Sequence, residues 1–121
     1  MEFSHITISV KDLDESLEFY RDVIGLPIKR RFSSGESEIV FLGSGETDIE
    51  LIYSKSQSDL LFGQSISLGF AVASLQDAKF RLQQKGIDAG EVIQPNPHVK
   101  FFFTSDPNGV RIQFVESIDH V

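Results

Sequence analysis

Hydrophobic and polar residues alternate near the start of the chain, and the period of the pattern then lengthens. Ile6, Ile8 and Val10 alternate with polar residues, which is typical of a strand that buries one face, and we place this strand at Phe3–Val10. Apolar residues then recur at intervals of four, three and four: Leu13, Leu17, Tyr20 and Ile24. This spacing predicts an amphipathic helix.

Residues that begin and end helices lie on either side of this stripe. Asp12 followed by Glu15 resembles a capping box, with Asp in place of the usual Ser or Thr. Gly25 suits a left-handed turn at the helix end, and Pro27 prevents the helix from continuing. Three strands are expected next, at Ile28–Ser33, Glu38–Leu42 and Asp48–Tyr53. The first half of the chain therefore has the order β-α-β-β-β.

The same order begins again after a polar, serine-rich linker at about residues 56–65. Ser74 and Asp77 repeat the capping pattern 62 residues after Asp12 and Glu15, and Gly86 is placed to end the second helix. Strands are expected at Ser67–Val72, Glu91–Gln94, Lys100–Ser105 and Val110–Glu116, with a hairpin turn at "DPNG". We interpret this correspondence as an internal repeat of about 60 residues.

The repeat predicts an α+β fold, with one domain at 1–121 made of two βαβββ modules at about 1–55 and 66–121. We expect the two sheets to join edge to edge into one curved, cup-shaped mixed sheet, with the helices on its convex side. Side chains alternate along a strand, so the concave face would carry these residues: His5, Thr7, Ser9, Asp48, Glu50, Ser67, Arg111 and Gln113. Alternation sends Phe102 to the face opposite its neighbours, where we interpret it as an apolar wall of the site.

Composition narrows the class of protein. The net charge is −7 and the pI about 4.8, which argues against nucleic acid or an anionic membrane surface as a partner, because both require a basic face. The chain has no cysteine, which excludes disulfides, thiolate nucleophiles and Cys-based metal sites. The N-terminus lacks the features of a signal peptide, and the apolar runs are too short to cross a bilayer. We expect a soluble cytoplasmic protein.

Two segments resemble the vicinal oxygen chelate superfamily, which includes glyoxalase I, bleomycin-resistance proteins and extradiol dioxygenases. They are "HITISVKDLDESLEFYRDVIGL" (His5–Leu26) and "FFFTSDPNGVRIQFVE" (Phe101–Glu116), and they look like the family's first strand and helix and its closing hairpin. The resemblance implies paired βαβββ modules, within a chain or across a dimer. It also implies a divalent metal held by one ligand from the first and one from the last strand of each module.

Carried over to this chain, the four ligand positions hold His5, Glu50, Ser67 and Gln113. Imidazole, carboxylate and amide oxygen suit Ni, Co, Zn, Mn or Fe(II), so His5, Glu50 and Gln113 are the predicted metal ligands. Resemblance to glyoxalase I (lactoylglutathione lyase) implies a carboxylate that moves a proton, and only Glu50 can do this because an amide is not basic. The dioxygenase chemistry requires a second His where Ser67 stands, and we reject it.

The sequence leaves two functions open. One is a metal-dependent lyase or isomerase with Glu50 as the catalytic base. The other is a metal-free protein that sequesters a small organic molecule, as bleomycin-resistance proteins do, with Asp48 and Glu50 favouring a cationic guest. The predicted substrate-binding residues are Thr7, Asp48, Ser67, Phe102 and Arg111, the last as a clamp for an anionic group. We expect a homodimer, because exposed sheet edges and a shared site favour one.

Overall fold

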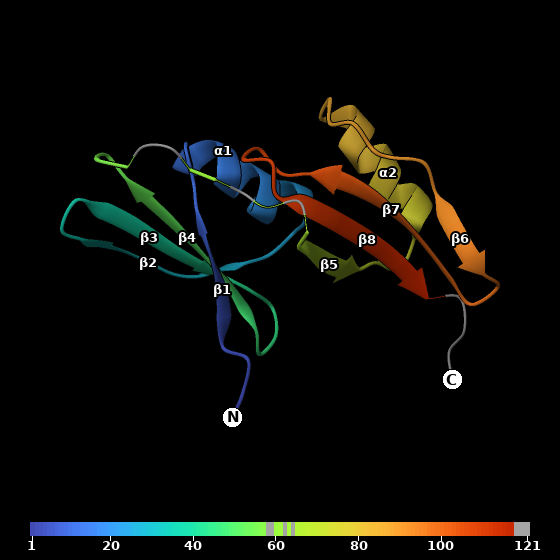
Figure 1. Ribbon diagram of the computed structural model, residues 1–121, viewed down its shortest axis with the longest axis horizontal. Helices are drawn as coiled ribbons and strands as arrows, with labels where there is room; N and C mark the ends of the chain where they lie inside the picture. Colours follow the sequence, from blue (N-terminus) through green and yellow to red (C-terminus); the bar gives the residue numbers. More distant parts are fainter. Residues whose placement is uncertain (58–59, 62, 64, 118–121) are drawn as a thin grey trace. The chain divides into compact units, whose positions relative to one another are not determined.

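The computed structural model describes residues 1–57, 60–61, 63 and 65–117. It divides into two compact units, Met1–Leu61 and Phe62–Val121, and each is described by itself. Both units have the order β-α-β-β-β that the sequence predicts (Figure 1). Among the described residues, no helix has the length and apolar character needed to cross a membrane. The joining of the two sheets into one curved sheet stays a prediction.

The first unit is a four-stranded mixed sheet with a helical segment. Its elements are β1 (His5–Ser9), α1 (Leu13–Leu17), η1 (Glu18–Val23), β2 (Ile28–Ser34), β3 (Ser37–Leu42) and β4 (Asp48–Ser54). The strand order is β1-β4-β3-β2, with β1 parallel to β4 and the other pairs antiparallel. The first and last strands of the module are therefore neighbours.

Strand alternation gives this sheet one buried and one open face. Ile8, Leu42 and Leu51 have side chains at most 5% exposed and, with Val40 and Ile49, form the core beneath the helix. The residues between them in sequence point to the other face, which carries His5 and Glu50. The face assignment made from the alternating sequence is confirmed for these strands by their register.

The first helix is not the regular α-helix that its spacing predicts. After Leu17 the chain widens into a π-helix, and the Ile24 N–H donates to the Phe19 carbonyl five residues back at 2.9 Å. This buries Phe19, Tyr20 and Val23, whereas Ile24 is only partly buried. A helix-period stripe could not identify Phe19 or Val23, because a π-turn rotates successive side chains by a smaller angle.

The second unit repeats the arrangement. Its elements are β5 (Ser67–Ala71), α2 (Leu75–Gln84), β6 (Ile93–Asn96), β7 (Val99–Ser105) and β8 (Arg111–Ser117), in the sheet order β5-β8-β7-β6. Strand β5 is parallel to β8, as β1 is to β4. In the predicted hairpin turn, the Asp106 carboxylate accepts hydrogen bonds from the N–H groups of Asn108 and Val110, and Gly109 has φ +96°.

Both α-helices begin at the predicted caps. The Asp12 carboxylate accepts from the Glu15 N–H at 3.0 Å, and the Ser74 hydroxyl accepts from the Asp77 N–H at 3.2 Å. Helix α2 has a second support from β8, because Glu116 accepts from the Leu75 N–H at 2.6 Å. Each cap satisfies backbone donors that a helix leaves unpaired.

Loss of either cap is expected to destabilise the protein. Asp12→Ala and Ser74→Ala should each lower the free energy of unfolding by about 1 kcal/mol, measured by urea denaturation. Asp14→Ala is the matched control, because this exposed carboxylate lies in the first turn beside Glu15 and caps no N–H group. The substitution should lower the free energy of unfolding by only about 0.3 kcal/mol. Equal losses in Asp12→Ala and Asp14→Ala would contradict a specific capping role.

Candidate functional site

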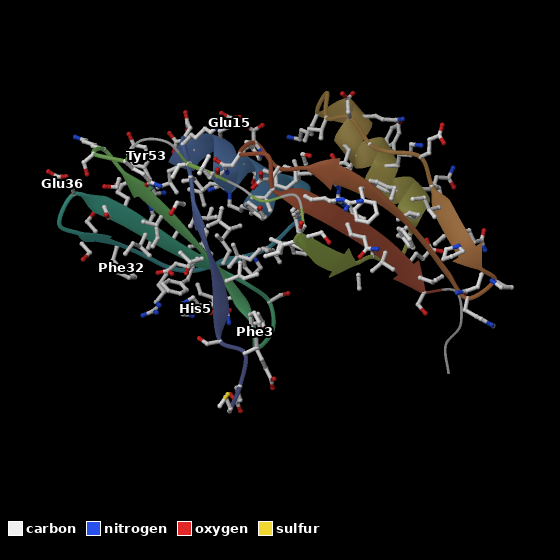
Figure 2. The ribbon with its side chains drawn as sticks, viewed as in Figure 1. Phe3, His5, Glu15, Phe32, Glu36 and Tyr53 are labelled. Carbon is white, nitrogen blue, oxygen red and sulfur yellow. The ribbon has the colours of Figure 1, made fainter. Side chains whose placement is uncertain are left out.

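The first and last strands of the first unit bring His5 and Glu50 together. Parallel pairing of β1 with β4 sets His5 opposite Asp48 and Thr7 opposite Glu50 on the open face of the sheet. His5 Nε2 lies 3.6 Å from Glu50 Oε1. The His5 side chain is 40% exposed and the Glu50 side chain 13% exposed, so solvent reaches the pair mainly at the imidazole. Figure 2 shows His5 on the thin β1 ribbon.

Neighbouring hydroxyl groups orient both members of this pair. The Thr7 hydroxyl donates to Glu50 Oε1 at 2.6 Å, and the Ser4 hydroxyl lies 2.8 Å from His5 Nδ1. If Nδ1 carries the proton and donates to Ser4, the lone pair of Nε2 is directed to the same side as Glu50. Thr7 contacts Glu50 in this structure, and its predicted contact with substrate stays a prediction.

An aromatic wall with a cation lies beside the pair. The Phe41 ring meets His5 edge to face at 5.6 Å between centroids and lies nearly parallel to Phe32. The Arg30 guanidinium carbon lies 4.4 Å from the Phe41 centroid and 5.6 Å from that of Phe32. Figure 2 shows Phe32 on the same side of the sheet as His5. These residues extend the open face across β3 and β2.

Asp48, whose predicted contact with substrate stays a prediction, pairs with a lysine of the same sheet. Its Oδ1 lies 2.7 Å from Lys29 Nζ as an ion pair rather than an aligned hydrogen bond, and Lys29 also donates to the Gly45 carbonyl. A Cβ at Gly43 would lie 2.6 Å from the same Oδ1, which explains the glycine at that position. Because Lys29 neutralises Asp48, the structure removes one of the two charges that favoured a cationic guest.

The second unit places Ser67, Arg111 and Gln113 on its own open face. Ser67 pairs with Arg111 and Gly69 with Gln113, at the positions that match His5, Asp48, Thr7 and Glu50. Gly69 lies where the first unit has Thr7, so it has no hydroxyl to donate to Gln113 as Thr7 donates to Glu50. Among the described residues we find no hydrogen-bond partner for the Gln113 amide. The Arg111 guanidinium lies 3.8 Å from the Phe103 centroid.

The predicted role of Phe102 requires correction. Phe102 is fully buried, pairs with Phe114 across β7 and β8, and packs on that ring at 5.4 Å between centroids. It belongs to the core beneath the helix and cannot line an open site. Phe103 pairs with Gln113, so Phe101 and Phe103 form the apolar part of the face that was assigned to Phe102.

Sequence reasoning missed Arg30, Phe41 and Lys29. Phe41 could have been found, since alternation from Ile39 puts it on the open face opposite Glu50. Arg30 and Lys29 could not, because a register irregularity between Ile28 and Arg30 changes which side chains face the site. Two open hollows of about 250 and 600 Å³ lie elsewhere, around Tyr53 and the tip of the β2–β3 hairpin, and neither includes His5 or Glu50.

Residues 2–114 match the model of the Glyoxalase/Bleomycin resistance protein/Dioxygenase superfamily. The chain belongs to this superfamily. Its membership confirms the resemblance inferred from the two sequence segments and establishes a glyoxalase-like family assignment.

Named relatives of this superfamily member span nearly its whole length. It is 28% identical to a probable lactoylglutathione lyase of Synechocystis, and the match covers 93% of both chains. It is 29% identical to a lactoylglutathione lyase of Haemophilus influenzae, and the match covers 97% of this chain and 93% of that protein. The fold is similar to that of Leishmania major glyoxalase I, with a TM-score of 0.83 at 21% identity over 96% of this chain and 86% of that one.

The donor atoms of the first unit fit a divalent metal. Two ligand atoms about 2.1 Å from one metal lie about 3 to 3.5 Å apart in octahedral or tetrahedral geometry, close to the 3.6 Å between His5 Nε2 and Glu50 Oε1. The described residues include no cluster of three His, Asp or Glu side chains that could hold a metal. Gln113 offers an amide oxygen and Ser67 a neutral hydroxyl at the matching positions of the second unit. Water or substrate would complete the coordination of a metal at His5 and Glu50.

Proposed function

We propose that this protein is a metal-dependent lyase or isomerase of the glyoxalase type, acting on a small organic molecule. His5 and Glu50 are the principal metal ligands, with Gln113 as the third, and the metal is one of Ni, Co, Zn, Mn or Fe. The observation that carries the proposal is the 3.6 Å approach of His5 Nε2 to Glu50 Oε1, with hydroxyl groups orienting both side chains. Relatives with the name lactoylglutathione lyase support the reaction class.

In the proposed reaction, each residue of the first unit at the site has a separate role. A metal held by His5 and Glu50 would supply Lewis acidity to a substrate carbonyl and so would make the adjacent C–H more acidic. Glu50 removes the proton and returns it to the neighbouring carbon. It is the one group of the predicted ligand set that can do so, because the His5 imidazole binds the metal through Nε2 with Nδ1 against Ser4, and the Gln113 amide is not basic. Thr7 fixes the Glu50 carboxylate and leaves Oε2 free of that hydrogen bond.

The proposal predicts stoichiometric metal uptake. Protein dialysed without chelator against Ni²⁺, Zn²⁺ or Mn²⁺ should retain about one equivalent of at least one metal by elemental analysis. His5→Ala should lose this metal, because the imidazole is the only nitrogen ligand of the set. The loaded protein should interconvert lactoylglutathione and the isomeric hemithioacetal, measured as formation of the thioester from the hemithioacetal.

A control separates this result from loss of folding. His98→Ala removes an exposed histidine that is not among the predicted ligands and should leave the metal content unchanged. Less than about a tenth of an equivalent of every metal in the wild-type protein would overturn the metal-dependent function.

A second candidate, metal-free binding of a small molecule, is favoured by Ser67 and Gln113. These residues replace half of the expected ligands with neutral groups, and one oxygen of Glu50 already accepts a hydrogen bond from the Thr7 hydroxyl. The fold is also similar to that of TnmS3, an antibiotic-binding protein from Streptomyces, with a TM-score of 0.76 at 14% identity over 97% of this chain and 96% of that one. Absence of metal together with saturable binding of a small molecule would favour this function.

The expected cytoplasmic location and homodimer also stay proposals. Strands β1, β2, β5 and β6 are the edges of their sheets within the units, and unpaired edges favour association with a second copy.

A further inference from the structure

Arg30 is held in place by aromatic rings on the open face of the first unit. Its guanidinium carbon lies over Phe41 and Phe32, whose rings are inclined by only 14° to each other. Such contacts restrict a long side chain while leaving its N–H donors free to bind another group. The Phe32 side chain remains 41% exposed, so an apolar surface adjoins the guanidinium.

The charge of Arg30 has no carboxylate partner among the described residues. The neighbouring Arg31 pairs with Glu38 at 3.6 Å and Lys29 pairs with Asp48 at 2.7 Å. Within the part of the chain that the structure describes, the Arg30 guanidinium lies over two rings and forms no ion pair. This is notable in a chain with 18 acidic and 11 basic residues, where carboxylates are abundant. A cation placed on rings and away from acidic groups is available to an anion from solution.

Strand register joins Arg30 to the His5–Glu50 pair. Arg30 pairs with Phe41, Phe41 with Glu50, and Glu50 with Thr7, so one row of side chains crosses all four strands on one face. Phe41 contacts both Arg30 and His5: its separations of 5.6 Å from the His5 ring and 4.4 Å from the Arg30 carbon put these two groups no more than about 10 Å apart. A small organic molecule can span that distance.

We propose that Arg30 binds a carboxylate group of the ligand, and that Phe32 contacts the apolar part of the same molecule. The planar guanidinium matches a carboxylate with two parallel hydrogen bonds. The ligand class is therefore an anionic molecule with an apolar body, in place of the cationic guest that the acidic composition favours. This assignment rests on the location of the proposed active site, but binding at Arg30 does not require a metal.

The second unit also has an arginine that lies over a phenylalanine ring. Arg111 lies over Phe103 at 3.8 Å, on the face that carries Gln113, and has no carboxylate partner among the residues described there. Its predicted role as an anion clamp is consistent with the role that we assign to Arg30. The two units thus each carry an arginine on a phenylalanine beside the residues at the ligand positions.

Binding of phenylacetate to metal-free protein tests the proposal. ¹⁵N–¹H NMR titration in the presence of EDTA should give saturable shifts at β2 and β3 residues, and uncharged phenylacetamide should bind at least about tenfold more weakly. Arg30→Gln should weaken phenylacetate binding by about the same factor and leave phenylacetamide binding unchanged. Arg30→Lys should recover only part of the loss, because an ammonium cannot form the planar pair.

Arg31→Gln is the matched control. Arg31 is the next residue on β2, points to the other face and pairs with Glu38, so its loss should not change phenylacetate binding. Equal affinities for phenylacetate and phenylacetamide, equal effects of Arg30→Gln and Arg31→Gln, or no saturable shift would each overturn the assignment. Because EDTA removes metal, these outcomes are independent of the metal-uptake measurement that tests the proposed function.

Discussion

Glu50→Gln is expected to lower the affinity for Ni²⁺ by roughly a hundredfold or more and to abolish turnover. Glutamine has nearly the same shape and can still accept the Thr7 hydrogen bond, so the substitution removes the charge and the basic oxygen while retaining the packing. Loss of an outer-shell partner alone costs about 10–100-fold in metal affinity, and loss of an anionic ligand should cost more. Competition with a chelating dye measures the affinity.

Glu38→Gln provides the control for this substitution. Glu38 is an exposed carboxylate on β3 that pairs with Arg31, and the same change in charge there should leave the Ni²⁺ affinity within about twofold of wild type. If Glu50→Gln binds Ni²⁺ as tightly as Glu38→Gln, Glu50 is not a metal ligand. Turnover lost with metal affinity retained would limit Glu50 to the role of base.

The order of elements could be predicted because the same sequence pattern occurs in both halves of the chain. Alternation in β1, β4, β5 and β8 fixes which side chains share a face, and the capping residues Asp12 and Ser74 mark the helix starts. These signals are local, and the buried face enforces them, since a one-residue slip would expose the whole apolar set. The approach of His5 to Glu50 followed from the same alternation together with the family resemblance.

The features that sequence reasoning missed depend on contacts between distant residues. The π-helix of η1 places Phe19 and Val23 in the core through packing that no helical period describes. The irregularity in β2 decides that Lys29 reaches Asp48 while Arg30 lies over Phe41. Composition suggested an acidic site, but pairing within the sheet neutralises one carboxylate and leaves an arginine available, so net charge did not predict local charge.

The error at Phe102 has a different cause. The three consecutive phenylalanines at 101–103 alternate between faces, and the sequence does not distinguish which of the two faces is the core. The parity is set by pairing with β8, where Phe102 opposes Phe114 and Phe103 opposes Gln113. The stabilities of variants at these adjacent positions therefore report the register of the second unit directly.

Phe102→Ala is expected to lower the free energy of unfolding by about 3–5 kcal/mol, because it removes a fully buried ring that packs on Phe114. Phe103→Leu should cost no more than about 1 kcal/mol, since this side chain lies on the open face and keeps most of its apolar volume. Urea denaturation followed by circular dichroism measures both. A slip of one residue between β7 and β8 would expose Phe102 and turn Gln113 away from the open face of the second unit, so a loss below about 1 kcal/mol for Phe102→Ala would contradict this register.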